Sequence, residues 1–491
     1  MVSANSIVFV SLFLGLTAGW QQVEVTVDRA VAVVELRLDG EPAARLEEPP
    51  WRVEIDLGPE LAPQHLEALA FDGEGGELGR ARQWINLPRQ RQEVRLLLER
   101  DGGRVTGGRL AWDSLEHLAT SSVRLSFDGD EFEVADPSAF ALPSHDAGRL
   151  HVLSAEVVFV GGATARADAV FGGEYGEVTA TELTAVPVLA DGRRLPRRAE
   201  RAAGWLAVGG RPAQVVAVDH GSADLYAVAD VGAGRHLEGL AVELQRRTGA
   251  ARFNSPLYGV GLRQGDRLFL LHPSVQKSTS YDLFGITSPL LATNGGTAWQ
   301  LASRRFVDES PGDLPQRLAD AVAAAALEAA AGGRPRAVVL LLGPLAVDES
   351  RHTPQVVRRF LDRLGVPLAV WYVEQLDVSL RLAEEAAATR AEERRKLVPP
   401  GERVEVEAVD PQAIAEARRR RLGAAREAWG EVADVDDVAA WVELNGDLRK
   451  SVARQAVLWI DGAHPPGAVA LGAAPPGVRL VTVDDVAGGG R

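Results

Sequence analysis

The 491-residue chain contains no cysteine, and its one methionine is the first residue. The lack of cysteine excludes disulfides, thiolate nucleophiles, thiolate zinc sites and iron–sulfur clusters. Lysine is also rare, because the 53 basic residues include only Lys277, Lys396 and Lys450, and the net charge is −15. Such an acidic chain lacks the basic footprint of a general nucleic-acid binder. A hydrophobic share of 46% and a charged share of 25% are still typical of folded proteins, and the length predicts several domains.

Long apolar runs are absent except near the amino terminus, where residues 7–16 are apolar and residues 17–19 are small. This run is too short for a membrane-spanning helix of about 20 residues. It has the length of the central region of a secretory signal, although the first six residues carry no Lys or Arg. We therefore predict a signal peptide at residues 1–19 and a periplasmic or secreted mature chain without a transmembrane segment. The alternative is that the run forms a hydrophobic first strand.

Apolar and polar residues alternate with a period of two from about residue 23 to residue 171. Turn pairs such as Asp39-Gly40 and Asp128-Gly129 interrupt this alternation, which predicts short strands with one buried face. The turn pairs recur at a spacing of about 87 residues, the size of one β-sandwich. The segment resembles the immunoglobulin-like modules of exported bacterial proteins. We therefore predict one such module at residues 20–90 and a second β-sandwich module at residues 91–178.

The pattern changes to alternating strands and helices beyond about residue 179. Apolar strands are predicted at residues 224–230, 266–271, 337–342 and 366–373, with helical segments between them. Their order predicts a doubly wound α/β domain, preceded by a β lead-in and extending to residue 491. Ligands of such sheets bind at the carboxyl ends of the strands.

A strongly charged helical insertion is predicted within this domain at about residues 376–430, with a short strand at 404–408. It contains the consecutive arginines 418–421. In an acidic chain we interpret this run as the solvated face of a helix, and a partner contact is the alternative.

The α/β part resembles the von Willebrand factor A-related domains of exported bacterial proteins. The resemblance covers residues 182–373. It is carried by the strand that ends at Asp230, the segment Gly295-Gly296-Thr297-Ala298, the strand that ends at Leu342, and Asp348-Glu349-Ser350. It implies a metal-ion-dependent adhesion site, in which a divalent cation is held by oxygen ligands and completed by an acidic group of a partner.

The ligand set of that site is incomplete in this sequence. The family pattern implies an Asp and two hydroxyls after the first strand, and a Thr and an Asp from two further loops. Asp230 and Thr297 match, whereas Gly232, Gly234 and Gly343 replace the other three. Two side chains rarely satisfy the octahedral shell of Mg²⁺, so we predict a vestigial site without bound metal. The structural alternative is that Asp230 caps the next helix and Thr297 bonds to loop backbone.

The glycines after Asp230 also permit a phosphate-binding interpretation, because exposed amides at the start of a helix attract anions. Gly232-x-Gly234 resembles a dinucleotide loop, but the third glycine falls at 239 instead of 237. No nucleophile elbow or Walker loop is found in the sequence. We therefore predict a non-catalytic exported protein without a cofactor, which binds a protein or cell-envelope component through its α/β domain. A nucleotide- or phosphate-binding enzyme that uses the Gly232/Gly234 loop is the alternative.

Overall fold

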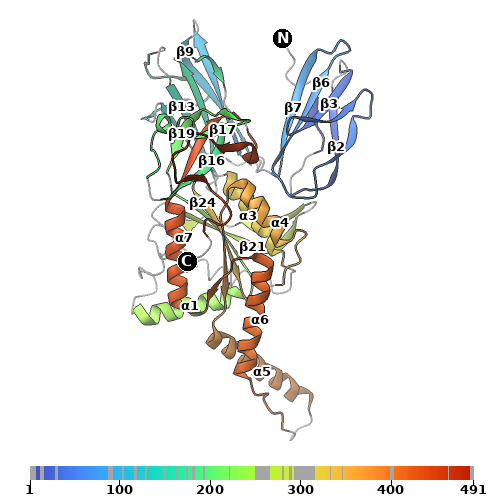
Figure 1. Cartoon of the computed structure of the whole chain (residues 1–491), viewed down its shortest axis with the longest axis vertical. Helices are drawn as coiled ribbons and strands as arrows, with labels where there is room; N and C mark the ends of the chain where they lie inside the picture. Colours follow the sequence, from blue (N-terminus) through green and yellow to red (C-terminus); the bar gives the residue numbers. More distant parts are fainter. Residues whose placement is uncertain are drawn as a thin grey trace.

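The computed structural model of the chain (Figure 1) combines several antiparallel β-sheets with one largely parallel sheet that is covered by helices. It describes residues 7–11, 16–27, 31–86, 92–101, 104–114, 119–127, 130–146, 151–160, 164–172, 175–179, 183–191, 194–220, 222–248, 266–278, 281–286, 290–291, 316–331, 333–344, 347–398, 403–462 and 464–486.

The first β module consists of two antiparallel sheets around one apolar core. Strands of the two sheets lie in the orders β1-β2-β5 and β4-β3-β6-β7. Val23 and Ile55 of one sheet and Leu36 and Leu66 of the other belong to the same buried cluster. The strands are β1 (Ile7–Phe9), β2 (Trp20–Val27), β3 (Val33–Leu38), β4 (Glu41–Leu46), β5 (Arg52–Asp56), β6 (Gln64–Phe71) and β7 (Glu77–Ile85).

The beginning of the amino-terminal run forms β1 of this module, in keeping with the alternative of a hydrophobic first strand. β1 pairs with β2, and the side chains of Ile7 and Phe9 are buried in the core. Hydrogen bonds between Thr17 and Asn86 fix the following segment. The cause is the alternation of the run, which directs Ile7 and Phe9 to the same face of the strand. Cleavage of the predicted signal peptide would therefore remove β1 from the module, and the cleavage itself stays a prediction.

The second β module is likewise built from two antiparallel sheets, β11-β10-β13-β14-β15 and β12-β9-β8, that share one core. His151 at the start of β13 is buried and stacks on Phe127. The strands are β8 (Gln92–Asp101), β9 (Arg104–Ser114), β10 (Thr120–Phe127), β11 (Asp130–Phe132), β12 (Phe140–Ala141), β13 (His151–Phe159), β14 (Thr164–Gly172) and β15 (Tyr175–Thr179).

A third β unit joins the lead-in to the end of the chain. β16 pairs with β27 and β29, so that Val186 faces Leu458 across the sheet. The last strands of the chain thus pair with the lead-in and not with the parallel sheet. The elements of this unit are β16 (Leu183–Ala190), η1 (Ala199–Ala202), β17 (Leu206–Val208), β18 (Arg211–Pro212), β19 (Val215–Asp219), β27 (Gln455–Asp461), η3 (Pro466–Ala468), β28 (Val469–Leu471) and β29 (Val478–Leu480).

The strands of the parallel sheet lie between β19 and β27 along the chain. Their order in the sheet is β22-β21-β20-β24-β25-β26. Neighbouring strands are parallel except that β22 and β23 run antiparallel to β21. The strands are β20 (Asp224–Ala229), β21 (Arg267–Ser278), β22 (Tyr281–Ile286), β23 (Leu290–Leu291), β24 (Arg336–Leu342), β25 (Leu368–Val373) and β26 (Ala433–Val435). Because the chain moves outward in both directions from β20, the strand order reverses there.

Helices cover both faces of the parallel sheet. Leu225 and Ala227 of β20 pack with α1 and α7 on one face, whereas Tyr226 and Val228 pack with α3 and α4 on the other. This alternation is why the central strands are buried over their full length. The helices are α1 (Ala233–Thr248), α3 (Leu318–Ala331), α4 (Pro354–Leu364), α5 (Leu376–Leu397), α6 (Pro411–Trp429) and α7 (Val438–Ala453).

A buried arginine joins two of these helices to the sheet. Arg336, the first residue of β24, is 2% exposed, and its guanidinium donates to the carbonyl oxygens of Ala330, Leu364 and Gly365. These oxygens lie at the carboxyl ends of α3 and α4, where a cation is favoured. Burial lowers the pKa of Arg336 to about 10, so it remains charged at neutral pH.

The first β module contacts the α/β domain directly. Leu61 is 1% exposed and belongs to the buried cluster of α3 and α4. Beside it, Glu60 forms ion pairs with Arg359 and Arg363 of α4. The module is therefore anchored to a helix of the sheet as well as joined to it along the chain.

α5 and α6 form a helical hairpin that extends away from the sheet (Figure 1). They follow β25 and occupy the region of the expected helical insertion. The short strand expected at residues 404–408 is wrong, because the described residues 403–410 have no regular structure. A lone β segment at the end of a helical hairpin has no neighbouring strand to pair with.

Candidate functional site

The carboxyl edge of the parallel sheet is the candidate site. β21 and β24 flank β20 on opposite sides, so the strand order reverses at the end of β20, where Asp230 follows the last strand residue. Crevices at such reversal points are where open α/β sheets bind ligands.

The carboxylate of Asp230 is used within the protein. The residue is fully buried, and its Oδ2 accepts a 3.0 Å hydrogen bond from the backbone N–H of Gly343, beyond the end of β24. Its backbone carbonyl, not its side chain, accepts the N–H of Ala233 at the start of α1. Asp230 therefore joins the ends of two strands.

The described part of the predicted metal site has no space for a ligand at the third-loop position. A Cβ atom at Gly343 would lie 2.4 Å from the backbone nitrogen of Ala233, so an Asp side chain has no space at the third-loop position. Thr297 lies outside the described residues, as does the rest of the segment 295–298. Among the residues that the structure does describe, no group of three or more His, Asp or Glu side chains is arranged to hold a metal ion.

Asp348, the first carboxylate after Gly343 in the sequence, forms hydrogen bonds elsewhere. Its Oδ1 accepts from the backbone N–H of Leu318 at 2.9 Å, and its Oδ2 accepts from that of Ala319 at 3.2 Å. Because these amides begin α3, Asp348 caps that helix from a distant loop. Asp320 in the same turn binds Arg317 and His352. Burial opposes ionisation of Asp320, but these hydrogen bonds outweigh burial and lower its pKa to about 2.

A cavity of about 580 Å³ lies at the carboxyl edge, between the loops after β20 and β24 and the hairpin. Its wall is mostly apolar, and Gly232 contributes to it. The apolar side chains are Val231, Pro344, Leu382, Ala383, Ile414 and Ala417. The polar and charged side chains are Arg235, His236, Glu374, Ser379 and Arg421. A space of this size and character is typical of a small-molecule site.

Glu374, in the cavity wall, follows the last residue of β25, and its carboxylate accepts several hydrogen bonds. It is fully buried, and its carboxylate accepts hydrogen bonds from Tyr372, Ser379 and Arg421. Burial alone would raise the pKa of Glu374, but these donors outweigh burial and lower it. Glu374 is therefore an anion with satisfied oxygens at neutral pH, and it positions Arg421 toward the sheet.

His236 in the first turn of α1 carries the donor that is still available. Its Nδ1 accepts the backbone N–H of Gln375 at 3.1 Å. Burial lowers the pKa of His236 to about 4, so the ring is neutral and carries its proton on Nε2. Within the described part of the chain, Nε2 has no hydrogen-bond partner, although the side chain is completely buried.

The arginine run 418–421 divides between two environments. Arg418 and Arg421, three residues apart on one face of α6, turn inward and pair with Asp434 and Glu374. Arg419 and Arg420 are exposed. The interpretation as a solvated face is thus correct for the two middle residues and wrong for the two outer ones. A helical period applied to the run indicates the inward pair.

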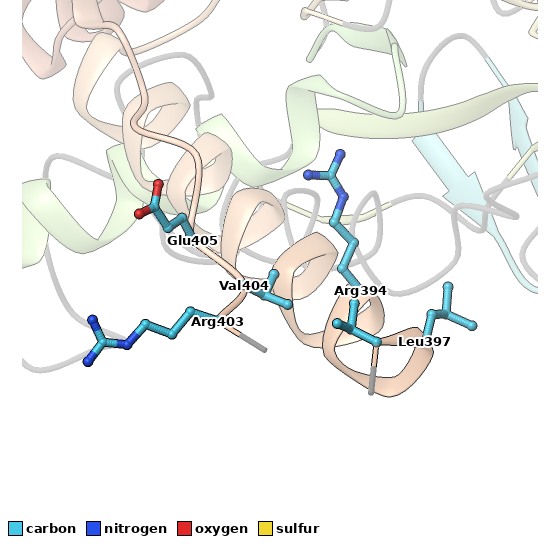
Figure 2. Close-up of a pocket in the computed structure, with 6 residues that line it drawn as sticks. Arg394, Leu397, Arg403, Val404 and Glu405 are labelled. Atoms are coloured by element: carbon cyan, nitrogen blue, oxygen red, sulfur yellow. The ribbon is translucent and has the colours of Figure 1, made fainter. Parts of the chain in front are cut away.

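The end of the hairpin forms a second, open surface. Figure 2 shows Arg394 and Leu397 near the end of α5 beside Arg403, Val404 and Glu405 of the returning chain. The side chain of Leu397 is 85% exposed. We refer to residues 394–398 and 403–406 as the hairpin tip.

The Gly232/Gly234 loop offers fewer free amides than its sequence implies. The backbone N–H of Val231 donates to Oε1 of Gln316, and that of Ala233 donates to the carbonyl of Asp230. Both glycines are buried. The loop is therefore packed against its neighbours, and Gly232, but not Gly234, is among the residues that line the cavity.

No protein-family model matches the chain, and a search of curated proteins finds no relative. Among solved structures, it is similar to the fibronectin(III)-like modules of Clostridium thermocellum CbhA, at 16% identity over 16% of this chain and 92% of that chain, with a TM-score of 0.15. The central fibronectin-III array of RIM-binding protein matches at 10% identity over 44% of this chain and 84% of that chain, with a TM-score of 0.21.

SGBP-B of the Bacteroides ovatus mixed-linkage glucan utilization locus, in complex with a mixed-linkage heptasaccharide, matches at 10% identity over 43% of this chain and 58% of that chain, with a TM-score of 0.13. At such TM-scores the likenesses carry no argument about function, and the fold class rests on the strand pairing. Among the described residues, no helix combines the length and the apolar character needed to cross a membrane.

Proposed function

We propose that the chain is a non-catalytic, exported binding protein whose α/β domain is a degenerate von Willebrand factor A-like domain that works without metal. The main support for this proposal is the hydrogen bond from the backbone N–H of Gly343 to the carboxylate of Asp230. This bond occupies an oxygen of the carboxylate that was expected to hold the ion. The close approach at Gly343 also leaves no space for a ligand side chain at that position. The strand order, with an antiparallel edge strand β22 beside β21, is compatible with this ancestry.

The hairpin tip is the surface that we propose for the partner, a protein or cell-envelope component. Leu397 projects an apolar side chain into solvent beside the exposed cations Arg394 and Lys396. An exposed apolar side chain among cations favours a partner that offers an apolar pocket with acidic groups at its rim. The contrast with the net charge of −15 of the whole chain makes this tip a locally distinct surface.

The test is retention of envelope proteins by the immobilised full chain and by two matched variants. Leu397→Asp places a charge at the tip, whereas Val160→Asp places the same charge at a 57% exposed site of the second β module. We expect saturable binding of one component that Leu397→Asp abolishes and Val160→Asp leaves intact, with or without EDTA. Equal binding by both variants, or loss of binding in EDTA, contradicts the proposal.

Export is tested separately by cell fractionation and amino-terminal sequencing. The proposal predicts protein in the periplasmic or extracellular fraction with a first residue near Trp20. Recovery in the cytosol with Met1 retained would assign the amino-terminal run to β1 of the working protein and contradict export by this signal.

A further inference from the structure

The wall of the cavity at the carboxyl edge includes a histidine whose ring donor is unused within the described part of the chain. His236 is 0% exposed, lines the cavity, and has an Nε2–H group without a partner among the described residues. Leaving a buried donor unpaired is costly, and such groups are rare in folded proteins. A ligand that accepts this hydrogen bond would offset that cost.

The charges around this donor favour an anion of low charge. α1 begins at Ala233, so its amino-terminal turn, with its partial positive charge, lies beside the cavity. Arg235 and Arg421 add two positive charges, and Glu374 adds one negative charge that is already neutralised by three donors. The wall therefore carries a net charge of about +1, which suits a monoanion better than a phosphate dianion facing Glu374.

The remaining wall favours an apolar body. Leu382, Ala383, Ile414 and Ala417, contributed by the two hairpin helices, line the 580 Å³ space. A bare inorganic anion would leave this apolar surface without contacts, whereas a ligand with a hydrocarbon portion would cover it.

We infer that this cavity binds a small organic monocarboxylate, with its carboxylate on Nε2 of His236 near the start of α1 and its apolar portion against Ile414 and Ala417. The inference does not depend on the proposed partner, because the cavity and the hairpin tip share no residue. Either proposal can fail while the other stands.

The test is calorimetric titration of the full chain with octanoate, and with octan-1-ol and inorganic phosphate as separate arms. His236→Asn deletes the donor at Nε2, while its shorter amide keeps an acceptor near the position of Nδ1 for Gln375. Ala417→Phe fills the cavity from α6. Ala424→Phe is its matched control, because Ala424 is exposed on the same helix and does not line the cavity.

We expect octanoate to bind with a stoichiometry of one. His236→Asn should weaken the affinity for octanoate at least about tenfold, the loss typical of a hydrogen bond to a charged group. Ala417→Phe should abolish octanoate binding, and Ala424→Phe should leave it unchanged. Far-ultraviolet circular dichroism verifies that each variant is folded. Absence of octanoate binding, equal binding of octan-1-ol, tighter binding of phosphate, or insensitivity to both cavity variants would overturn the inference.

Discussion

The backbone N–H of Gly343 donates a hydrogen bond to the buried carboxylate of Asp230, and this bond joins the loops after β24 and β20. The close approach that makes the bond possible leaves no space for a side chain at 343. One contact thus accounts for two features of the edge: the buried carboxylate at 230 has a hydrogen-bond partner, and position 343 is glycine.

Gly343→Ala is expected to destabilise the protein by about 3 kcal/mol, because the new Cβ would overlap the backbone of Ala233. Gly423→Ala is the control, since a Cβ there meets nothing within 4 Å and the residue lies inside α6. The control should be stabilising by about 0.5–1 kcal/mol. Urea unfolding of both variants measures the difference, and equal effects would refute the close packing at 343.

Stability should fall between about pH 6.5 and pH 4 because of His236. Burial lowers the pKa of His236 in the folded protein to about 4. The carboxylates of Glu374 and Asp377 act in the opposite direction and raise this pKa. The cations of Arg418 and Arg421 lower it further. Since the unfolded chain binds the extra proton in this window, the stability present above pH 6.5 is lost on acidification, by roughly 3 kcal/mol.

The measurement is urea unfolding of wild type and of His236→Asn at a series of pH values. The variant lacks the titrating group, so its stability should vary less between pH 6.5 and pH 4. Parallel curves for the two proteins would show that another group causes the acid loss.

Phe9→Ala should destabilise the uncleaved chain by about 3 kcal/mol, because it empties a buried position in the core of the first module. Val10→Ala, at a 54% exposed neighbour, should change stability by less than about 0.5 kcal/mol. Thermal unfolding of the full-length variants gives both values. Identical melting of the two would mean that β1 does not stabilise the module.

Local sequence patterns predicted most elements of the α/β domain. The strand expected at residues 337–342 and the helix expected at 354–364 match β24 and α4 to within one residue. These elements are defined by their own periodicity, and α4 also has the cap residue Thr353 and a terminal glycine, Gly365, with φ of 61°.

Pairing between distant segments was not predictable in the same way. β16 and β27 are separated by more than 250 residues, and nothing in either strand indicates its partner, so the third β unit appeared only in the structure. Arg336 was missed for a related reason: its acceptors, such as the carbonyl of Leu364, are brought to it by two helices that follow different strands.

The sequence predicted at which edge of the sheet the candidate site lies, but not which side chains line it. Asp230 marks the correct edge, because the end of the first central strand follows from its apolar run. Glu374, like Asp230, is a carboxylate directly after a buried strand, but it belongs to no motif that the sequence analysis considered. His236 lies in a helix whose period places it inward, and only the hairpin, which folds over it, makes it part of a cavity.

The proposal that the α/β domain works without metal is tested by titrating Mg²⁺ and then Mn²⁺ into the full-length chain by calorimetry. We expect no saturable heat for either ion at millimolar concentration, and the same unfolding curve in either ion and in EDTA. Saturable binding of one ion that Asp230→Asn abolishes would contradict it.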